Sequence, residues 1–234
     1  MINDRFISAI IVAAGSGKRM GTKVKKQFII LEDKPIIYYS LSEFDKSEFI
    51  DEIVLVTSKD EIDYCKELVN KGNISKRVTI VEGGKTRQES VYCGLTNVNR
   101  KTDVVLVHDG ARPFIKNLDL RKLVKEAMIY GSVTFGVLSK DTIKLKNENI
   151  EIVETLDRSK LIAIQTPQAF LYDKLFLAHK KAQSDNYLGT DDTVLLDRCG
   201  IVTKVVEGSY YNIKITTKED LDFANIIKKK LQIS

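Results

Sequence analysis

Short apolar runs alternate along more than half of the chain with longer segments whose apolar residues recur at helical spacing. The runs are rich in Val and Ile, which is typical of strands buried on both faces. They cover residues 10–12, 52–57, 78–81, 104–107 and 133–138. The helical segments cover residues 36–44, 60–71, 86–97 and 118–130. This alternation predicts an α/β fold in which a mostly parallel sheet carries helices on both faces.

Turn residues mark the ends of several predicted helices. Pro35 stands at the favoured first position of one helix. Asp60 is the predicted N-cap of the next, because its side chain can accept a hydrogen bond from a free backbone N–H. Gly72 and Gly131 follow the last periodic residues of two helices, where glycine commonly ends a helix. On parallel sheets ligands bind beyond the carboxyl ends of the strands, so the polar turns there are the candidate site.

Residues 141–156 break this rhythm. Ile143 and Leu145 alternate with polar residues, a turn is expected at 146–149, and Ile150 and Ile152 alternate again. This pattern predicts a β-hairpin, and an isolated hairpin is marginally stable in water. We therefore expect a projecting β-arm at about residues 140–158 that packs on a second copy of the chain. The alternative is a hairpin folded back on its own domain.

The last third of the chain adds further predicted elements to the same domain. A strand at 162–165 leads through Thr166-Pro167-Gln168 to a helix at 172–184, and residues 190–193 cap another helix. Short strands are expected at 202–206 and 212–215. Thr217 and Asp220 form a capping box for the last helix. We see no interdomain linker, and we expect residues 1–234 to form a single domain.

The stretch at residues 8–27, SAIIVAAGSGKRMGTKVKKQ, combines a strand, a glycine turn and clustered positive charge. Gly15 and Gly17 permit backbone conformations that a side chain would forbid. Five cationic residues follow within nine positions: Lys18, Arg19, Lys23, Lys25 and Lys26. Backbone N–H groups and cations together suit a bound phosphate. The alternative is a glycine turn beside a solvated run of charges.

Two common phosphate-binding loops do not match this stretch. A P-loop requires Gly where Val12 stands and Ser or Thr where Arg19 stands. The dinucleotide fingerprint, started at Gly15, requires Gly or Ala where Met20 stands.

Composition narrows the class of ligand. The formal net charge of +5 suits an anionic small molecule, but it is too small and too dispersed to indicate nucleic acid.

No apolar run reaches the roughly 18 residues of a membrane span, and we recognise no signal peptide at the N-terminus. The three cysteines are scattered without a C-x-x-C pair, so we expect neither a disulfide framework nor a zinc site. A reducing cytoplasm is the expected location.

Four further clusters accompany the glycine loop. They are Gly83-Gly84 followed by Arg87 and Ser90, the run His108–Pro113, the triplet Thr166-Pro167-Gln168, and Asn212-Ile213-Lys214. Each alone could be a cap, a turn or a surface ion pair. Together and in this order they resemble one family, the 2-C-methyl-D-erythritol 4-phosphate cytidylyltransferases of the non-mevalonate isoprenoid pathway. The matching segments are AAGSGKRM, KKQ, GGKTRQES, HDGARP, DTIK, ETLDRSKL, TPQAF, GTDD and NIKIT.

The resemblance implies a Rossmann-like nucleotidyltransferase domain with a β-arm that joins a homodimer. It implies transfer of CMP from CTP to the sugar-alcohol phosphate, with Mg²⁺ as cofactor. The phosphate loop would comprise Ala13, Ala14, Gly15 and Gly17, and the catalytic cations would be Arg19 and Lys26. The nucleotide would also contact Gly83, Arg87, Ser90, Asp109 and Ala111, with Asp109 near the metal. The sugar phosphate would be held by Thr142, Arg158 and Lys214, with Thr166 and Thr190 lining the pocket; Thr142 and Arg158 would serve the neighbouring subunit's site.

The sequence departs from the family pattern at two positions. Lys25 stands where many members have Pro, which adds a charge beside Lys26 and could change the stiffness of the loop. Gly110 stands where many have Ala. The related ribitol-5-phosphate cytidylyltransferases share HD-x-x-RP, TPQ and NIK and remain the alternative function. They more often begin L-A-G-G, whereas this chain reads Val12-Ala13-Ala14-Gly15, and its ETLDRSKL segment also favours the methylerythritol enzymes.

The expected reaction explains why the chain needs no catalytic histidine. A phosphate monoester is largely ionised near pH 7, so it attacks the α-phosphorus of CTP without a general base. Positioning and electrostatic stabilisation by cations then lower the barrier. Of the two histidines, we interpret His108 as structural at a strand end and His179 as a helix surface residue.

A non-catalytic nucleotide-binding or RNA-binding module is the rival from another class. It predicts aromatic residues interleaved with the cations at 18–26, but only Phe28 follows them. The sequence therefore favours the enzyme.

Overall fold

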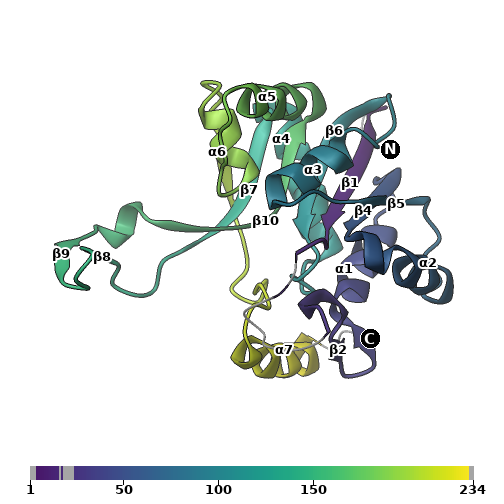
Figure 1. Ribbon diagram of the computed structural model, residues 1–234, viewed down its shortest axis with the longest axis horizontal. Coiled ribbons are helices and arrows are strands. Elements are labelled where there is room, and N and C mark those ends of the chain that lie inside the picture. The colour runs from purple at the N-terminus through teal and green to yellow at the C-terminus, as the bar shows by residue number, and fades with distance from the viewer. Residues whose placement is uncertain (1–3, 16, 18–23, 232–234) are drawn as a thin grey trace.

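A seven-stranded sheet forms the centre of the protein, for which a computed structural model describes residues 4–15, 17 and 24–231 (Figure 1). Its strand order is β11-β7-β10-β6-β1-β4-β5. Strand β10 is antiparallel to both of its neighbours, and the other pairs are parallel. The strands are β1 (Phe6–Val12), β4 (Glu52–Thr57), β5 (Val78–Glu82), β6 (Thr102–Asp109), β7 (Ser132–Leu138), β10 (Ile162–Leu171) and β11 (Lys204–Glu207). The predicted mostly parallel α/β sheet is confirmed.

Helices cover both faces of the sheet because successive side chains of each central strand point to opposite sides. On β1, Ile11 belongs to the core under α1 (Ile36–Asp45), α2 (Ile62–Lys71) and α4 (Asn117–Tyr130). Ile10 belongs to the core under α3 (Arg87–Leu95), α5 (Tyr172–Ser184) and α6 (Asp192–Asp197). In the described part of the chain, no helix has the length and apolar character that crossing a membrane requires.

Three predictions about local structure are wrong. Pro35 is the N-cap residue rather than the first helical residue, because α1 begins at Ile36. Asp60 is not an N-cap, because a 3-10 turn at Lys59–Glu61 precedes α2, which begins at Ile62 without a side-chain cap. Residues 212–215 do not form a strand. The Ile215 N–H donates instead to the Ala111 carbonyl at 2.9 Å, so this segment is tied to the turn after β6 rather than to the edge of the sheet.

The C-terminal helix α7 (Lys218–Leu231) anchors that segment. Thr217 and Asp220 make the predicted capping box, in which each backbone N–H donates to the other's side chain. The helix packs on the hairpin of β2 (Ile30–Leu31) and β3 (Lys34–Pro35) and on α1. Its buried Lys228 ammonium donates to Asp33 at 2.9 Å and to the Tyr39 hydroxyl at 2.7 Å. Burial opposes this charge, but these hydrogen bonds outweigh it and raise the pKa of Lys228.

The predicted β-arm projects from the body (Figure 1). It consists of β8 (Lys144–Lys146) and β9 (Ile152–Thr155), an antiparallel pair separate from the main sheet, followed by a 3-10 turn at Arg158–Lys160. The apolar side chains of Ile150, Ile152 and Val153 are 60–76% exposed. The hairpin therefore buries little of its apolar surface within its own chain.

Gly94 sets how closely α3 approaches the sheet. A Cβ atom at this position would lie 2.5 Å from Ile10 Cγ2 and 3.2 Å from Val56 Cγ2. We therefore expect Gly94→Val to lower the free energy of unfolding by about 1–3 kcal/mol, the usual cost of overpacking a core. Urea denaturation measures this change. Cys93→Val, one position away on the same helix, is the matched control; equal stability of the two variants would contradict this packing.

Candidate active site

A cavity of about 280 Å³ opens at the carboxyl ends of β1 and β6. Five segments line it: the turn after β1, the 3-10 turn at Lys26–Phe28, the connection from β5 into α3, the turn after β6, and the segment at 212–215. Its lining residues are Val12, Ala13, Ala14, Gly15, Lys26, Gln27, Gly84, Lys85, Thr86, Arg87, Ser90, Asp109, Ala111 and Lys214. Segments far apart in the sequence thus meet where the parallel sheet predicts a ligand site.

The loop after β1 is held in place by backbone and side-chain contacts. The Ala13 N–H donates to the Val56 carbonyl at 2.7 Å. The buried Gln27 amide donates to the carbonyls of Ala13 and Gly15. Sequence analysis did not assign a role to Gln27, although its KKQ triplet belongs to the family pattern.

Gly17 brings the same loop close to Lys26. Its φ is +64°, and a Cβ atom there would lie 3.1 Å from the Lys26 backbone nitrogen. Both the conformation and the space therefore favour glycine. Arg19, the other predicted catalytic cation, lies outside the described residues.

Lys25 does not line the cavity, although it is adjacent to Lys26. Its ammonium donates to the Ser58 hydroxyl at 2.5 Å and lies 3.4 Å from the Glu61 carboxylate. The unusual lysine therefore attaches the end of the loop to the β4–α2 connection.

The opening turn of α3 forms the facing wall. Thr86 is its N-cap and accepts a hydrogen bond from the Glu89 N–H. The Ser90 hydroxyl donates to the Thr86 carbonyl at 2.8 Å. Gly83 allows the two walls to meet, because a Cβ atom there would lie 2.7 Å from Ala14 Cβ and 2.8 Å from Ser90 Oγ.

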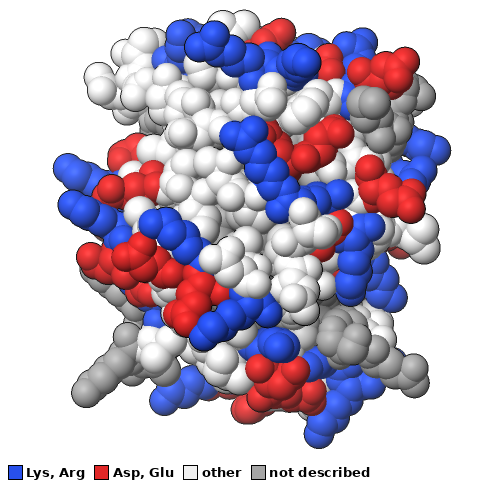
Figure 2. Space-filling model, turned by 90° about the vertical axis from the view of Figure 1, so that its right-hand side faces the viewer, with Lys and Arg blue, Asp and Glu red and all other residues white. Residues whose placement is uncertain are grey.

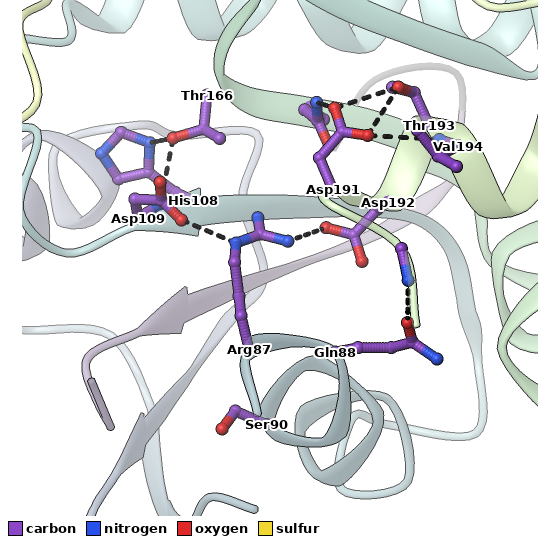
Figure 3. A network of polar contacts seen from close by, with 12 residues as sticks. Arg87, Gln88, Ser90, His108, Asp109, Thr166, Asp191, Asp192, Thr193 and Val194 are labelled. Atoms are coloured by element: carbon purple, nitrogen blue, oxygen red, sulfur yellow. Dashed lines mark hydrogen bonds and ion pairs between the residues drawn. The ribbon is translucent and has the colours of Figure 1, made fainter. Parts of the chain in front are cut away.

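The buried Asp109 carboxylate at the end of β6 contacts two cations, of which Figure 3 shows Arg87. One oxygen lies 3.0 Å from Arg87 Nε, and the other lies 2.6 Å from Lys214 Nζ. Burial alone would raise the pKa of Asp109, but Arg87 and Lys214 outweigh it and hold the pKa well below its usual range. The carboxylate is therefore ionised, and it fixes both cations at the cavity.

Hydrogen bonds of His108 hold the same strand end in place. Its Nε2–H donates to the Arg112 carbonyl at 3.0 Å, and its Nδ1 accepts from the Thr166 hydroxyl at 3.2 Å. The Thr166 hydroxyl in turn accepts from the Asp109 N–H at 3.0 Å. Burial lowers the pKa of His108 to about 4, so the ring is neutral at physiological pH. These contacts give His108 the structural position that we predicted.

A second pocket of about 370 Å³ adjoins the first and shares Arg87, Asp109 and Lys214 with it. Three residues that line it carry a buried polar atom without a hydrogen-bond partner among the described residues: Arg87 NH2, Arg112 Nε and Gln168 Oε1. Asn212, which donates to the Thr166 carbonyl, carries another, Oδ1. Unpaired buried polar atoms are costly, and this part of the site is polar and incompletely hydrogen-bonded within the described chain. Thr166 and Thr190 line this pocket as predicted candidates.

Thr142 and Arg158 line neither of these pockets within the described chain. Both are exposed at the base of the arm, where an Arg158 terminal nitrogen donates to the Lys140 carbonyl at 3.2 Å. Of the predicted residues that the structure describes, those on the body lie in or beside the two pockets, Gly17 and Gly83 contributing to the walls without lining them, and the two on the arm lie apart.

The prediction that His179 is a surface residue is wrong. Its side chain is 1% exposed, and its Nε2 lies 3.0 Å from the Asp192 carboxylate. The ring faces α3 and α6 because α5 packs its neighbours Ala178 and Ala182 against the core.

Asp109 is a weak candidate as a metal ligand on its own. The described residues contain no group of three or more His, Cys, Asp or Glu side chains that could hold a metal ion. A single carboxylate does suit Mg²⁺ that is bound mainly through substrate phosphates and water. The donor set at Asp109 fits that mode.

Comparisons with known proteins agree on one family. The model of the family "IspD: 2-C-methyl-D-erythritol 4-phosphate cytidylyltransferase" matches residues 7–230. A protein of that name from Clostridium botulinum (strain ATCC 19397 / Type A) is 47% identical over 96% of this chain and 98% of its own. One from Clostridium novyi (strain NT) is 49% identical over 96% and 97%.

Solved structures show the same similarity. The 4-diphosphocytidyl-2C-methyl-D-erythritol synthase of Anaerococcus prevotii DSM 20548 superposes with a TM-score of 0.86 at 35% identity, over 99% of this chain and 98% of its own. The 2-C-methyl-D-erythritol 4-phosphate cytidylyltransferase of Thermus thermophilus gives a TM-score of 0.80 at 25% identity, over 96% and 99%.

The neutral His108 predicts an acid-sensitive stability. Unfolded His takes up its proton near pH 6.5, whereas the buried ring resists protonation until about pH 4. The unfolded state binds more protons in this window, so stability falls as pH falls through it, by roughly 3 kcal/mol in total. Urea denaturation between pH 7 and pH 4 should show a smaller loss for His108→Gln than for the wild type. Equal losses would contradict the buried neutral ring.

Proposed function

Because the chain belongs to the 2-C-methyl-D-erythritol 4-phosphate cytidylyltransferase family, we propose that it transfers CMP from CTP to 2-C-methyl-D-erythritol 4-phosphate. The products are the CDP-methylerythritol compound and pyrophosphate. The observation that carries this assignment to the site is the cavity at the ends of β1 and β6. Lys26, Arg87 and Lys214 line it, and the last two contact the Asp109 carboxylate. An anionic nucleotide and an anionic acceptor both need such a site. We expect the reaction to take place in the cytoplasm.

The nucleotide occupies the first cavity in this proposal. Its triphosphate lies against the glycine loop and Lys26, and its base lies near Gly83 and the opening turn of α3. Backbone N–H groups at a loop and a helix start favour bound anions. Ala14, Gly84 and Ser90 line this part of the cavity, and the family resemblance assigns it to the cytosine.

Electrostatic stabilisation supplies the catalysis. The acceptor phosphate is largely ionised near pH 7, so its oxygen attacks the α-phosphorus directly and pyrophosphate leaves. Lys26 and Arg19 neutralise charge on the transferring and leaving phosphates, and Lys214 holds the acceptor. Because Asp109 fixes Arg87 and Lys214 before substrates bind, these charges need little reorganisation during the reaction.

Mg²⁺ completes this charge balance. Asp109 would hold it together with the phosphates of CTP, and the ion would neutralise charge on the triphosphate.

The acceptor occupies the second pocket, and the active site is shared within a homodimer. Arg112, Thr166, Thr190 and Lys214 line this pocket on the body. The partner subunit's Thr142 and the partner subunit's Arg158 complete it, because the exposed apolar arm needs a second chain to cover it. A two-fold exchange of arms gives a self-complementary interface. The planar guanidinium of Arg158 can donate two hydrogen bonds to one phosphate.

An RNA-binding function has less support. On the face shown in Figure 2, which is turned away from the arm, positive and negative side chains are interspersed rather than gathered by sign. Ribitol 5-phosphate as acceptor is the remaining alternative, and the names of the similar proteins favour methylerythritol phosphate.

A pyrophosphate-release assay tests the proposed function. With CTP and methylerythritol phosphate we expect turnover, and with ATP or with ribitol 5-phosphate we expect kcat/KM to be lower by at least roughly a hundredfold, since an unmatched buried polar group is costly. Comparable activity with ATP would reject the nucleotide assignment. Comparable activity with ribitol 5-phosphate would reject the acceptor.

Lys26→Ala should lower kcat by roughly 10²–10³ with the fold intact, because it removes preorganised charge at the reacting phosphorus. Arg19→Ala should act in the same way. Lys25→Ala is the matched control: it removes the neighbouring ammonium, which contacts Ser58 and Glu61 outside the cavity, and should reduce kcat far less. Near-wild-type kcat in Lys26→Ala would show that this lysine is only a solvated charge.

Mixing two inactive variants tests the shared site. In a heterodimer of Lys26→Ala and Arg158→Ala, one site carries both defects and the other carries neither. Activity should then reappear and approach half of wild type per heterodimer. A mixture that stays inactive after demonstrated subunit exchange would mean that each arm serves its own chain.

A further inference from the structure

The opening turn of α3 is bonded to the loop before α6, on the side away from the nucleotide cavity. Arg87 NH1 lies 2.7 Å from the Asp192 carboxylate. The Gln88 amide donates to the Tyr187 carbonyl at 3.0 Å and accepts from the Gly189 N–H at 2.8 Å. Figure 3 shows Arg87 extended between Asp109 and Asp192, with Gln88 turned toward the loop. Two successive residues of α3 thus attach the cavity wall to one neighbouring segment.

Asp192 is itself held in place by a second partner, His179. Its side chain is 1% exposed, and its second oxygen accepts a hydrogen bond from His179 Nε2 at 3.0 Å. Burial alone would raise the pKa of Asp192, but Arg87 and His179 outweigh it and lower that pKa. A continuous chain of polar contacts therefore runs from the buried His179 through Asp192, Arg87 and Asp109 to the partly exposed Lys214.

The imidazole of His179 has a defined orientation. It is stacked on the Tyr92 ring at a centroid distance of 6.2 Å and an interplanar angle of 23°. Tyr92 is stacked in turn on Phe176 at 5.9 Å. The aromatic stack keeps Nε2 directed at Asp192, so α5 contributes to the position of a residue two contacts away.

Neither His179 nor Asp192 lines the nucleotide cavity or the acceptor pocket. Their side chains reach the nucleotide cavity through Arg87, which contacts Asp192 and lines both the cavity and the pocket. An arginine side chain has several rotatable bonds, and ordering it costs free energy. Its bonds to Asp109 and Asp192 order the Arg87 side chain in the folded protein before a ligand binds. Arg87 NH2 stays buried without a partner among the described residues.

We propose that Asp192 and His179 are positioning residues for the nucleotide, which hold Arg87 from behind and thereby set the affinity for CTP. This inference rests on the proposed function, because it takes the first cavity as the CTP site. It concerns binding rather than chemistry, since Arg87 belongs to the α3 segment of the cavity lining, whereas the catalytic cation Lys26 belongs to a different segment. The dissociation constant for CTP should therefore change more than kcat.

Asp192→Asn tests the proposal with little change in shape. The asparagine keeps an oxygen for Arg87 but removes the charge, and charge-assisted hydrogen bonds are about twice as strong as neutral ones. We expect the dissociation constant for CTP, measured by calorimetry with Mg²⁺ present, to rise about tenfold, while kcat falls less than about threefold. Asp197→Asn makes the same change on the exposed end of the same helix and should leave CTP binding unchanged.

A double-mutant cycle separates positioning through Arg87 from a general structural role. In an Arg87→Met background the residue that Asp192 positions is absent, so Asp192→Asn should cause no further loss of CTP affinity. A multiplicative loss in the double variant would overturn the proposal, because Asp192 would then act by another route.

If Asp192→Asn does not fold, a pair of His179 variants tests the contact between His179 and Asp192. His179→Gln can still donate to Asp192, whereas His179→Leu fills the space without a donor. We expect His179→Gln to bind CTP with near wild-type affinity. We expect His179→Leu to bind it several-fold more weakly, even where the melting temperatures of the two variants are similar. Equal CTP affinities of the two variants would overturn the proposal.

The wild-type titration separates this inference from the proposed function. If wild-type protein fails to bind CTP, the proposed function fails and the inference falls with it. If wild-type protein binds CTP and Asp192→Asn binds it equally tightly, the proposed function stands and only the positioning role is rejected.

Discussion

The arrangement of the site depends on one buried carboxylate, that of Asp109. An unpaired charge in the interior costs several kcal/mol, so the fold must bring cations to it. Arg87 and Lys214 meet it at 3.0 and 2.6 Å, one on each oxygen. These two cations come from distant parts of the sequence, and the carboxylate holds both where an anionic ligand would need them.

Each of the three charges is placed by a different part of the fold. Asp109 ends β6, next to β1 at the centre of the sheet. Arg87 is the first residue of α3, which approaches the sheet closely because position 94 has no side chain. Lys214 lies in a segment tied by Ile215 to the turn after β6 and by the capping box to α7. Secondary structure, packing and site electrostatics are therefore coupled at Asp109.

Much of this could be predicted from the sequence, because strands and glycine turns have local signatures. The Val- and Ile-rich runs predicted the sheet, and its topology placed Asp109 and the glycine loop at the same edge. The unpartnered pattern at 141–156 predicted the arm. The errors concern residues whose environment is set by distant partners. His179 shares its helix face with the buried Leu175 and Ala182, but the carboxylate that pairs with its ring, Asp192, lies 13 positions further on. Residues 212–215 alternate like a strand but bond to a turn.

A crystal structure of the protein with CTP bound tests the central claim most directly. The account predicts that the triphosphate lies against the glycine loop and Lys26, while Arg87 remains bonded to both Asp109 and Asp192. CTP bound away from this cavity, or Asp109 separated from both Arg87 and Lys214 in the complex, would contradict it.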